Sequence, residues 1–223
     1  MGAQSNSHLR PKVAVDAVVL SFAQREFQTY LVRPRAAAAR GKWACPGGLV
    51  AVGETLDDAA RRELRASGLA NEPYLEQLFT FGNPSRDPAA HVISVAYLAL
   101  VAAPVRSSSP TKKYFEGSWF RVSALPALAY DHALMVRRGI ARVQAKLGYT
   151  NIACNLLPES FCFSELEALY SGVLGRVLDR RNFRRRIMAM GILRPAPGVR
   201  RGNHRPAQLY RFLKRDLQTV QIL

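Results

Sequence analysis

The sequence predicts an α+β protein of two domains, and two observations carry that prediction. Residues 11–148 mix strand-like apolar runs with helical segments, whereas residues 149–223 combine short helices with one hairpin pattern. The basic residues are also densest in the second part, because residues 176–215 carry 13 Lys and Arg against one acidic residue, Asp179. With 223 residues and 48% hydrophobic composition, the chain can form one large core or two ordinary ones.

The bulk composition predicts a cytoplasmic protein without a membrane segment. Residues 1–10 are polar and predict a disordered start without a signal-peptide core, and no apolar run reaches the length of a membrane span. The three cysteines, Cys45, Cys154 and Cys162, have no metal-ligand spacing, and their odd number argues against a disulfide framework. We therefore expect reduced thiols and no metal site.

The first domain, residues 11–148, is predicted to be built mainly of strands. Its first strand should pair with the second across the polar turn at 24–26, and Thr55 with Asp58 resembles a capping box that begins a helix. In order, the predicted segments are strands at 13–20 and 27–33, a basic loop at 35–42, a strand entering a Gly-Gly turn at 43–50, a helix at 57–64, strands at 75–81 and 92–101, a surface loop at 103–117, a strand at 119–120 and a helix from 131 to about 147.

The second domain, residues 149–223, is predicted to follow a boundary at 148–150. A short helix is expected at 151–157, and a second helix should begin at the capping box of Ser164 to Glu167. The third helix spans 179–190, with Asp179 as its N-cap and Gly191 as the left-handed residue beyond its end. Its apolar stripe is formed by Phe183, Ile187 and Met190.

The opposite face of this third helix is basic and predicts DNA binding. Guanidinium groups match phosphate oxygens and the guanine edge, and asparagine matches the adenine edge. A basic tip and a returning strand at 208–212 follow, which is the layout of a winged helix-turn-helix. The predicted DNA-binding residues are Arg180, Arg181, Asn182, Arg184, Arg185, Arg200, Arg201, Asn203, His204 and Arg205. The alternatives are a solvated basic face and an RNA-binding or scaffold protein, although the basic stretch lacks aromatic stacking platforms.

Three segments of the first domain, taken together, resemble the Nudix hydrolases, which cut nucleoside diphosphates linked to another group. Gly48-x5-Glu54-x7-Arg62-Glu63-Leu64 matches the opening of the Nudix box. The segments 43–48 and 80–88 resemble the ADP-ribose pyrophosphatase branch. The resemblance implies an α/β/α sandwich with a mixed sheet.

The box departs from the active pattern where two glutamates should follow. Ala66 and Ser67 take their places, and the segment is one residue short before Gly68. In an active box, carboxylates on one helix face converge on Mg²⁺, which demands near-octahedral oxygen coordination. We therefore predict no catalytic residue and no hydrolase activity. An ADP-ribose pyrophosphatase with an atypical metal site is the main alternative.

A degenerate Nudix domain joined to a winged helix is similar to the Nudix-related transcriptional regulators of NAD metabolism, from about residue 13 to residue 212. The resemblance implies a homodimeric repressor of NAD biosynthesis or salvage genes that binds a palindromic DNA operator. It also implies an effector, ADP-ribose or a related NAD metabolite, in the old active site, with no cofactor required.

The candidate effector residues follow from the chemistry of a nucleoside diphosphate. The backbone of Gly47 and Gly48 allows a phosphate to approach closely. Arg35 and Arg86 are candidate cations for the pyrophosphate, and a second group supplies ribose acceptors and the rest of the box: Asp87, Asp131, His132, Glu54, Arg62 and Glu63. Trp43 is either a stacking platform or a core residue, His132 is either a ligand or a helix cap, and Arg62 with Glu63 is either a site or an ion pair.

Overall fold

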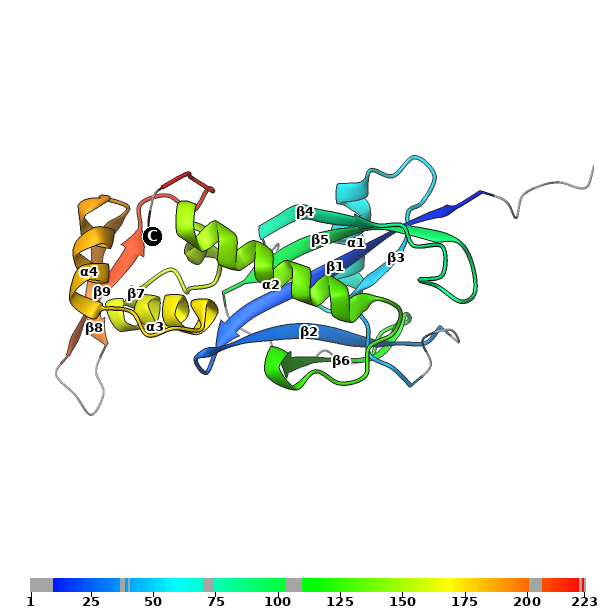
Figure 1. Cartoon of the computed structure of the whole chain (residues 1–223), viewed down its shortest axis with the longest axis horizontal. Coiled ribbons are helices and arrows are strands. Elements are labelled where there is room, and N and C mark those ends of the chain that lie inside the picture. The colour runs from blue at the N-terminus through cyan, green and yellow to red at the C-terminus, as the bar shows by residue number, and fades with distance from the viewer. Residues whose placement is uncertain are drawn as a thin grey trace, which may run out of the picture.

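The computed structural model describes residues 10–36, 39, 41–69, 74–102, 110–200, 206–220 and 222, and it has the two predicted parts (Figure 1). The first part is a six-stranded sheet in the order β4-β5-β1-β2-β6, with β3 also paired to β1. Because β1 runs parallel to β5 while the other pairs are antiparallel, the sheet is mixed, as predicted. The strands are β1 (Lys12–Ala23), β2 (Glu26–Pro34), β3 (Gly47–Leu49), β4 (Tyr74–Phe81), β5 (Val92–Val101) and β6 (Tyr114–Arg121).

Two helices cover the sheet, α1 (Leu56–Ala66) on one face and α2 (His132–Tyr149) on the other (Figure 1). The alternation of side chains along β1 determines which residues meet which helix. Val18 and Leu20 belong to the cluster that contains α2, whereas Val15 packs with the alanines of α1. At Gly139 a Cβ atom would lie 2.7 Å from the Val18 side chain, so the glycine lets α2 approach the sheet closely.

The second part is a winged helix-turn-helix, as predicted. Its sheet has the order β7-β9-β8, and the exposed end of the molecule is formed by α4 and the β8–β9 hairpin (Figure 1). Asp179 accepts a hydrogen bond from the backbone N–H of Asn182 (3.1 Å), and Gly191 has φ +63°, so both predicted ends of α4 are confirmed. The elements are the 3₁₀ helix η3 (Ile152–Asn155), β7 (Phe161–Cys162), α3 (Phe163–Leu174), α4 (Arg180–Ala189), β8 (Leu193–Arg200) and β9 (Ala207–Phe212).

Three local predictions were wrong. The helix α3 is capped by Cys162, whose N–H donates to the Glu165 carboxylate (2.6 Å), so Ser164 already lies inside the helix. Gly47 and Gly48 form strand β3 rather than a turn, because they pair with β1. Residues 114–117 belong to β6 rather than to a loop, because they pair with β2.

The C-terminal segment closes the junction between the two parts. Val220 and Ile222 donate backbone hydrogen bonds to the carbonyls of Tyr149 (2.8 Å) and Gly148 (3.0 Å) at the end of α2. The predicted boundary at 148–150 therefore falls on a helix end that the C-terminus covers. The three cysteines are buried free thiols. Among the described residues, no helix combines the length and the apolar character needed to cross a bilayer.

Candidate functional site

A cavity of about 700 Å³ opens where the end of β2, strand β3 and the start of α2 meet. Six of the predicted effector residues line it: Arg35, Gly47, Gly48, Arg86, Asp87 and His132. The lining and its charge network also include residues that the sequence did not single out, among them Asp16, Ser94, Lys112, Lys113 and Tyr114. The cavity therefore collects cations from several segments that lie far apart in the sequence.

The buried carboxylate of Asp16 is the centre of the charge network beneath the cavity. Ser94 donates to it (2.6 Å), the Arg86 guanidinium lies 3.5 Å away and His132 Nε2 lies 3.6 Å away. Burial raises the pKa of Asp16, but His132, Ser94 and Arg86 outweigh it and lower the pKa overall. Asp16 is therefore ionised and neutralises part of the positive charge at the cavity floor.

Arg86 and Asp131, predicted as separate contacts of the effector, bind each other. Two guanidinium nitrogens of Arg86 donate to the Asp131 carboxylate at 3.0 and 2.7 Å. The Arg86 side chain is 4% exposed, and of these two residues only Arg86 is part of the described cavity wall. The pair fixes the loop at 82–88 to the residue before α2.

His132 contacts the segment just before strand β3 as well as Asp16. The backbone N–H of Cys45 donates to its Nδ1 atom (2.9 Å), which leaves the Nε2 atom to face Asp16. Burial lowers the pKa of His132, and the neighbouring Asp16 carboxylate raises it by more. The Asp16 carboxylate favours a second ring proton, whereas the Cys45 N–H opposes one on Nδ1 because it needs that nitrogen as its acceptor. In the geometry shown, the hydrogen bond from Cys45 leaves Nδ1 unprotonated and places the ring proton on Nε2.

The two glycines of β3 are required by the side chains behind them. A Cβ atom on Gly47 would collide with the Asp16 carboxylate. One on Gly48 would collide with the Glu63 carboxylate and the Lys113 ammonium. The backbone therefore passes directly over two buried acidic groups, and Tyr114 anchors it through the Gly47 N–H and carbonyl (both 3.2 Å).

The remaining acidic residues of the Nudix box are paired with cations of the chain itself. Arg62 donates to Glu54 (2.7 and 2.8 Å) and to Glu63 (2.5 Å). Lys113 contacts the second oxygen of Glu63, and the Tyr114 hydroxyl, whose single proton the Gly47 carbonyl shares, lies 3.2 Å from that oxygen. Ala66 has no ligand group, and the Ser67 hydroxyl donates to the Leu64 carbonyl (2.7 Å). These residues do not fit Mg²⁺, and the described residues contain no cluster of three His, Cys, Asp or Glu side chains that could hold a metal ion.

Trp43 lies away from the cavity. The Trp43 ring packs on Phe120 with 4.6 Å between ring centroids, and the Arg33 guanidinium lies 5.0 Å from the centroid of the Trp43 ring. Within the described part of the chain, Trp43 is absent from the cavity lining. The structure thus places it with the core residues, which is the alternative position that the sequence left open.

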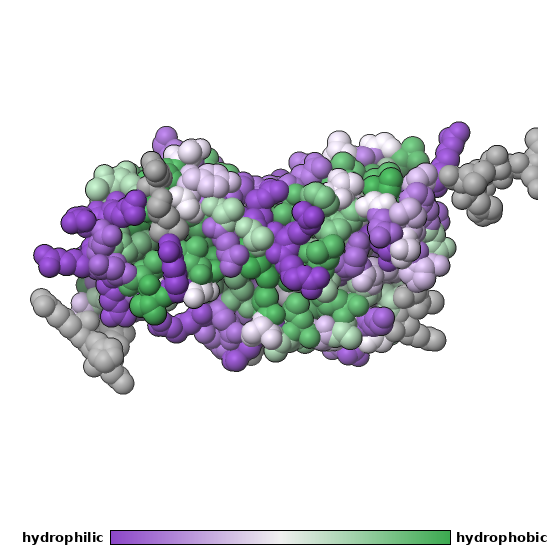
Figure 2. Space-filling view, in the orientation of Figure 1, coloured by the Kyte–Doolittle hydropathy of each residue, from purple (hydrophilic) through white to green (hydrophobic). Residues whose placement is uncertain are grey.

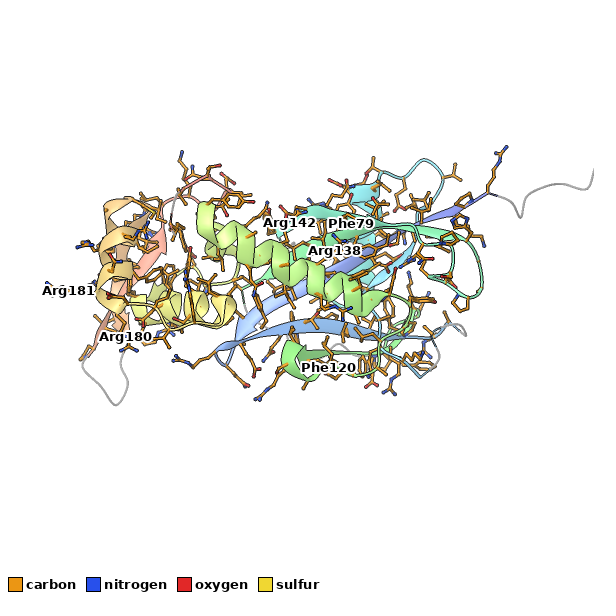
Figure 3. All side chains as sticks on the ribbon, in the orientation of Figure 1. Phe79, Phe120, Arg138, Arg142, Arg180 and Arg181 are labelled. Carbon is orange, nitrogen blue, oxygen red and sulfur yellow. The ribbon has the colours of Figure 1, made fainter. Side chains whose placement is uncertain are left out.

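The second candidate site is the outer face of α4, at the end of the molecule farthest from the cavity. Figure 2 shows hydrophilic residues gathered at this end, and Figure 3 shows Arg180 and Arg181 projecting there. Arg185 donates to Asn182 (2.8 Å), and Arg180 pairs with Glu167 of α3 (2.7 Å). Arg181 has no protein partner among the described residues. Arg181 is therefore an exposed cation in the first turn of α4 that no described residue of the protein neutralises.

Arg184, one of the predicted DNA-binding residues, is exposed and also contacts other parts of the winged-helix domain. It donates to the Tyr210 hydroxyl of β9 (2.9 Å), and its guanidinium lies 4.8 Å from the Phe163 ring centroid. Arg200 at the base of the wing pairs with Glu165 (2.8 Å). The predicted wing residues Arg201, Asn203, His204 and Arg205 lie outside the described residues.

Comparison with known proteins matches both parts of the chain. The model of the NUDIX domain matches residues 10–139, and the model of the NrtR DNA-binding winged helix domain matches residues 153–212. The ADPR responsive transcriptional repressor NtrR of Acinetobacter baylyi is 30% identical over 96% of this chain and 86% of its own length. The ADP-ribose pyrophosphatase of Methanocaldococcus jannaschii is 31% identical over 58% of this chain and 73% of its own length.

A solved relative has the same two-part architecture. Shewanella oneidensis NrtR in complex with a 27mer DNA superposes with a TM-score of 0.77 and 27% identity, covering 90% of this chain and 93% of that one. Its NUDIX domain in complex with ADP ribose superposes with a TM-score of 0.57 and 25% identity, covering 64% of this chain and 94% of that one. The order of the two domains and the likeness along almost the whole chain lead to one conclusion: this chain belongs to the NrtR family of Nudix-related regulators.

Proposed function

We propose that the chain is a transcriptional repressor that binds operator DNA through α4 and the β8–β9 wing. In this proposal the cavity binds ADP-ribose or a related NAD metabolite, and ligand binding changes the affinity for DNA. The observation that carries the proposal is the course of α2. This single helix begins in the cavity wall and ends at the winged-helix domain.

Contacts at the far end of α2 support this coupling. The Gln144 side chain donates to the Val173 carbonyl of α3 (2.8 Å), and Tyr149 accepts the hydrogen bond from Val220 of the C-terminal segment. A displacement of His132 by a ligand would therefore be carried along a continuous helix to the domain that holds α4. Energetic coupling between two sites of this kind is typically about 1–3 kcal/mol.

The chemistry of the cavity suits a diphosphate. Its rim carries Arg35, Lys112 and Lys113, and its floor carries the bare backbone of Gly47 and Gly48. Guanidinium and ammonium groups bind phosphate oxygens through charge-assisted hydrogen bonds. The named ligand of the Acinetobacter and Shewanella relatives is ADP-ribose, which has this diphosphate, and it is our first choice of effector.

We propose further that the active species is a homodimer on a palindromic operator near NAD biosynthesis or salvage genes. A single winged helix of this size gives modest affinity, and two-fold symmetry of the protein matches a palindrome. The ligand would then favour a dimer geometry that changes the fit to the two half-sites. A repressor acts on the chromosome, and we accordingly place the protein in the cytoplasm.

The test is fluorescence anisotropy with labelled palindromic DNA from upstream of the organism's own NAD-synthesis genes, at physiological salt, with and without ADP-ribose. We expect tight binding to this DNA, weaker binding to a scrambled duplex of the same length, and an affinity that ADP-ribose changes at least several-fold. Equal weak binding to both duplexes that ignores ADP-ribose would refute the proposal.

The second candidate function is ADP-ribose pyrophosphatase activity. It is favoured by the retained Glu54 and Glu63 and by the Methanocaldococcus relative. It is opposed by the cations that already occupy both carboxylates, Arg62 and Lys113. The assay is AMP formation from ADP-ribose with Mg²⁺ or Mn²⁺. We expect none above the rate without enzyme, and turnover that Glu63→Gln abolishes would establish the hydrolase instead.

A further inference from the structure

We infer that Lys113 takes over, within the chain, the role that a divalent cation has in an active Nudix site. On this view Lys113 neutralises Glu63 and presents an ammonium to a diphosphate in the cavity, so that binding needs no metal ion. The inference rests on the proposed function for the class of ligand. It goes beyond that function by naming the cation that contacts the diphosphate and by stating that ligand binding does not depend on a metal ion.

The first step is that Glu63 has no oxygen left for a metal ion. Its side chain is 1% exposed, and Arg62 occupies one oxygen at 2.5 Å. Lys113 and the Tyr114 hydroxyl occupy the other. Gly48 lies directly over this cluster, because a Cβ atom there would collide with both Glu63 and Lys113. The space above the carboxylate is therefore filled by an ammonium group.

The second step is that the Lys113 ammonium also faces the cavity. Lys113 belongs to the cavity lining, and its side chain is 39% exposed although its partner is buried. An ammonium has three donors, of which Glu63 uses one, so two remain for another acceptor. A group with this placement can bridge a buried carboxylate and a phosphate oxygen, as a metal ion would.

The third step is that a second cation is held beside it. One backbone hydrogen bond joins the Arg35 N–H to the Lys113 carbonyl (3.1 Å), and the Arg35 guanidinium donates to the Thr111 carbonyl (3.1 Å). The same guanidinium lies 4.2 Å from the Phe115 ring centroid. Arg35 and Lys113 thus form a positioned pair of cations, which matches the two charged phosphates of a nucleoside diphosphate-sugar.

The experiment is calorimetric titration of the full chain with ADP-ribose, in EDTA and in Mg²⁺. We expect dissociation constants that agree within about twofold in the two buffers. Binding that requires Mg²⁺ would overturn this inference and leave the proposed function intact. An absence of binding in both buffers would overturn both the inference and the choice of ADP-ribose as effector. Operator binding that ADP-ribose does not alter would then confirm that ADP-ribose is not the effector.

Two variants assign the effect to Lys113. Lys113→Met should weaken binding about tenfold in EDTA, whereas Lys42→Met, which removes an exposed lysine outside the cavity lining, should bind as the wild type does. Glu63→Gln should tighten binding, because the ammonium loses its competing anion. Circular dichroism establishes that each variant is folded. Unchanged affinity in folded Lys113→Met, or lost affinity in folded Glu63→Gln, would show that Lys113 is only the structural partner of Glu63.

Discussion

The Nε2 atom of His132 lies 3.6 Å from the Oδ1 atom of Asp16, and this contact joins α2 to β1 at the cavity. Both elements continue from there to the winged-helix domain. The helix reaches it through Gln144, and the strand reaches it through Phe22, which lies against Gly172 of α3. The buried pair is therefore the point at which a ligand in the cavity can act on two elements at once.

Removing the Asp16 carboxylate should strongly destabilise the fold. Asp16→Ala removes the acceptor of the Ser94 hydroxyl and the buried anion beside Arg86 and His132, although Arg86 keeps Asp131. Breaking a buried ion pair costs up to about 3–5 kcal/mol of unfolding free energy. Asp16→Asn keeps a polar acceptor and should cost less, about 1–3 kcal/mol. Urea unfolding measures both. The exposed Glu159→Gln serves as the control and should stay within about 0.5 kcal/mol of wild type.

Adding a methyl group at Gly172 should disturb the contact between the β1–β2 hairpin and α3. A Cβ atom there would lie 2.6 Å from the Phe22 ring and 2.8 Å from the Arg25 carbonyl, whereas one on Gly148 would meet nothing within 4 Å. Gly172→Ala should lower stability by about 1–3 kcal/mol, and Gly148→Ala should raise it by about 0.4–1 kcal/mol. Thermal melts would show the opposite signs, and equal signs would contradict the geometry.

The same pair of variants tests the route from the cavity to DNA. We expect the change in operator affinity caused by ADP-ribose to shrink in Gly172→Ala and to persist in Gly148→Ala. Anisotropy titrations with and without ADP-ribose give both values. Full coupling in Gly172→Ala would mean that α2 alone transmits the signal.

Arg181 and Arg184 should behave differently although they lie one turn apart on α4. Arg181→Ala should weaken operator binding while leaving stability unchanged, by about 1–3 kcal/mol for a base contact or by a uniform loss with a smaller salt slope for a phosphate contact. Arg184→Ala should also lower stability, by about 1 kcal/mol, because Arg184 donates to Tyr210. Melting curves distinguish the two variants. An unaltered melting temperature in Arg184→Ala would mean that Arg184 does not stabilise the domain and acts only as a DNA-contacting residue.

The ion pair of Glu54 with Arg62 should make stability depend on pH in the acid range. Hydrogen bonds from Arg62 lower the pKa of Glu54 from 4.5 to about 2. Because the folded-state pKa is the lower one, the stabilisation is complete above pH 4.5 and is lost as the pH falls towards about 2. Wild type should therefore be more stable than Glu54→Gln near neutral pH, and the difference should vanish towards pH 2. If the stability difference between wild type and Glu54→Gln stayed constant between pH 4.5 and about pH 2, the Glu54–Arg62 ion pair would not be its cause.

Sequence periodicity predicted the elements that local interactions determine. The helix α4 is an example, since its cap at Asp179, its buried Phe183 and the left-handed Gly191 that follows it all lie within twelve positions of one another. The errors arose where distant pairing decides the outcome. Gly47 and Gly48 become a strand because β1 lies beside them, and residues 114–117 join the sheet because β2 does.

The sequence predicted which residues belong to the site better than it predicted how they contact one another. Arg86 and Asp131 were both expected there, but their mutual ion pair spans 45 residues and leaves no local pattern. Asp16 had a signal that could have been used, because it interrupts the apolar run at 13–20. Lys113 had none, since it meets Glu63 from a Ser-rich and Lys-rich segment 50 residues away.

One hydrophobic cluster extends from Val18 in the sheet through Val143 of α2 to Ile187 of α4. A core shared in this way makes the two parts one cooperative unit, so heating should give a single calorimetric transition with equal van't Hoff and calorimetric enthalpies. ADP-ribose in the cavity would then protect the amide protons of α4 from hydrogen exchange as well as those of the sheet. Among the described residues, this shared core also joins the winged-helix domain to the sheet without a flexible linker between them. In the proposed homodimer, the regulatory motion would then lie between subunits, where a slight rotation at each cavity would change the separation of the two α4 helices.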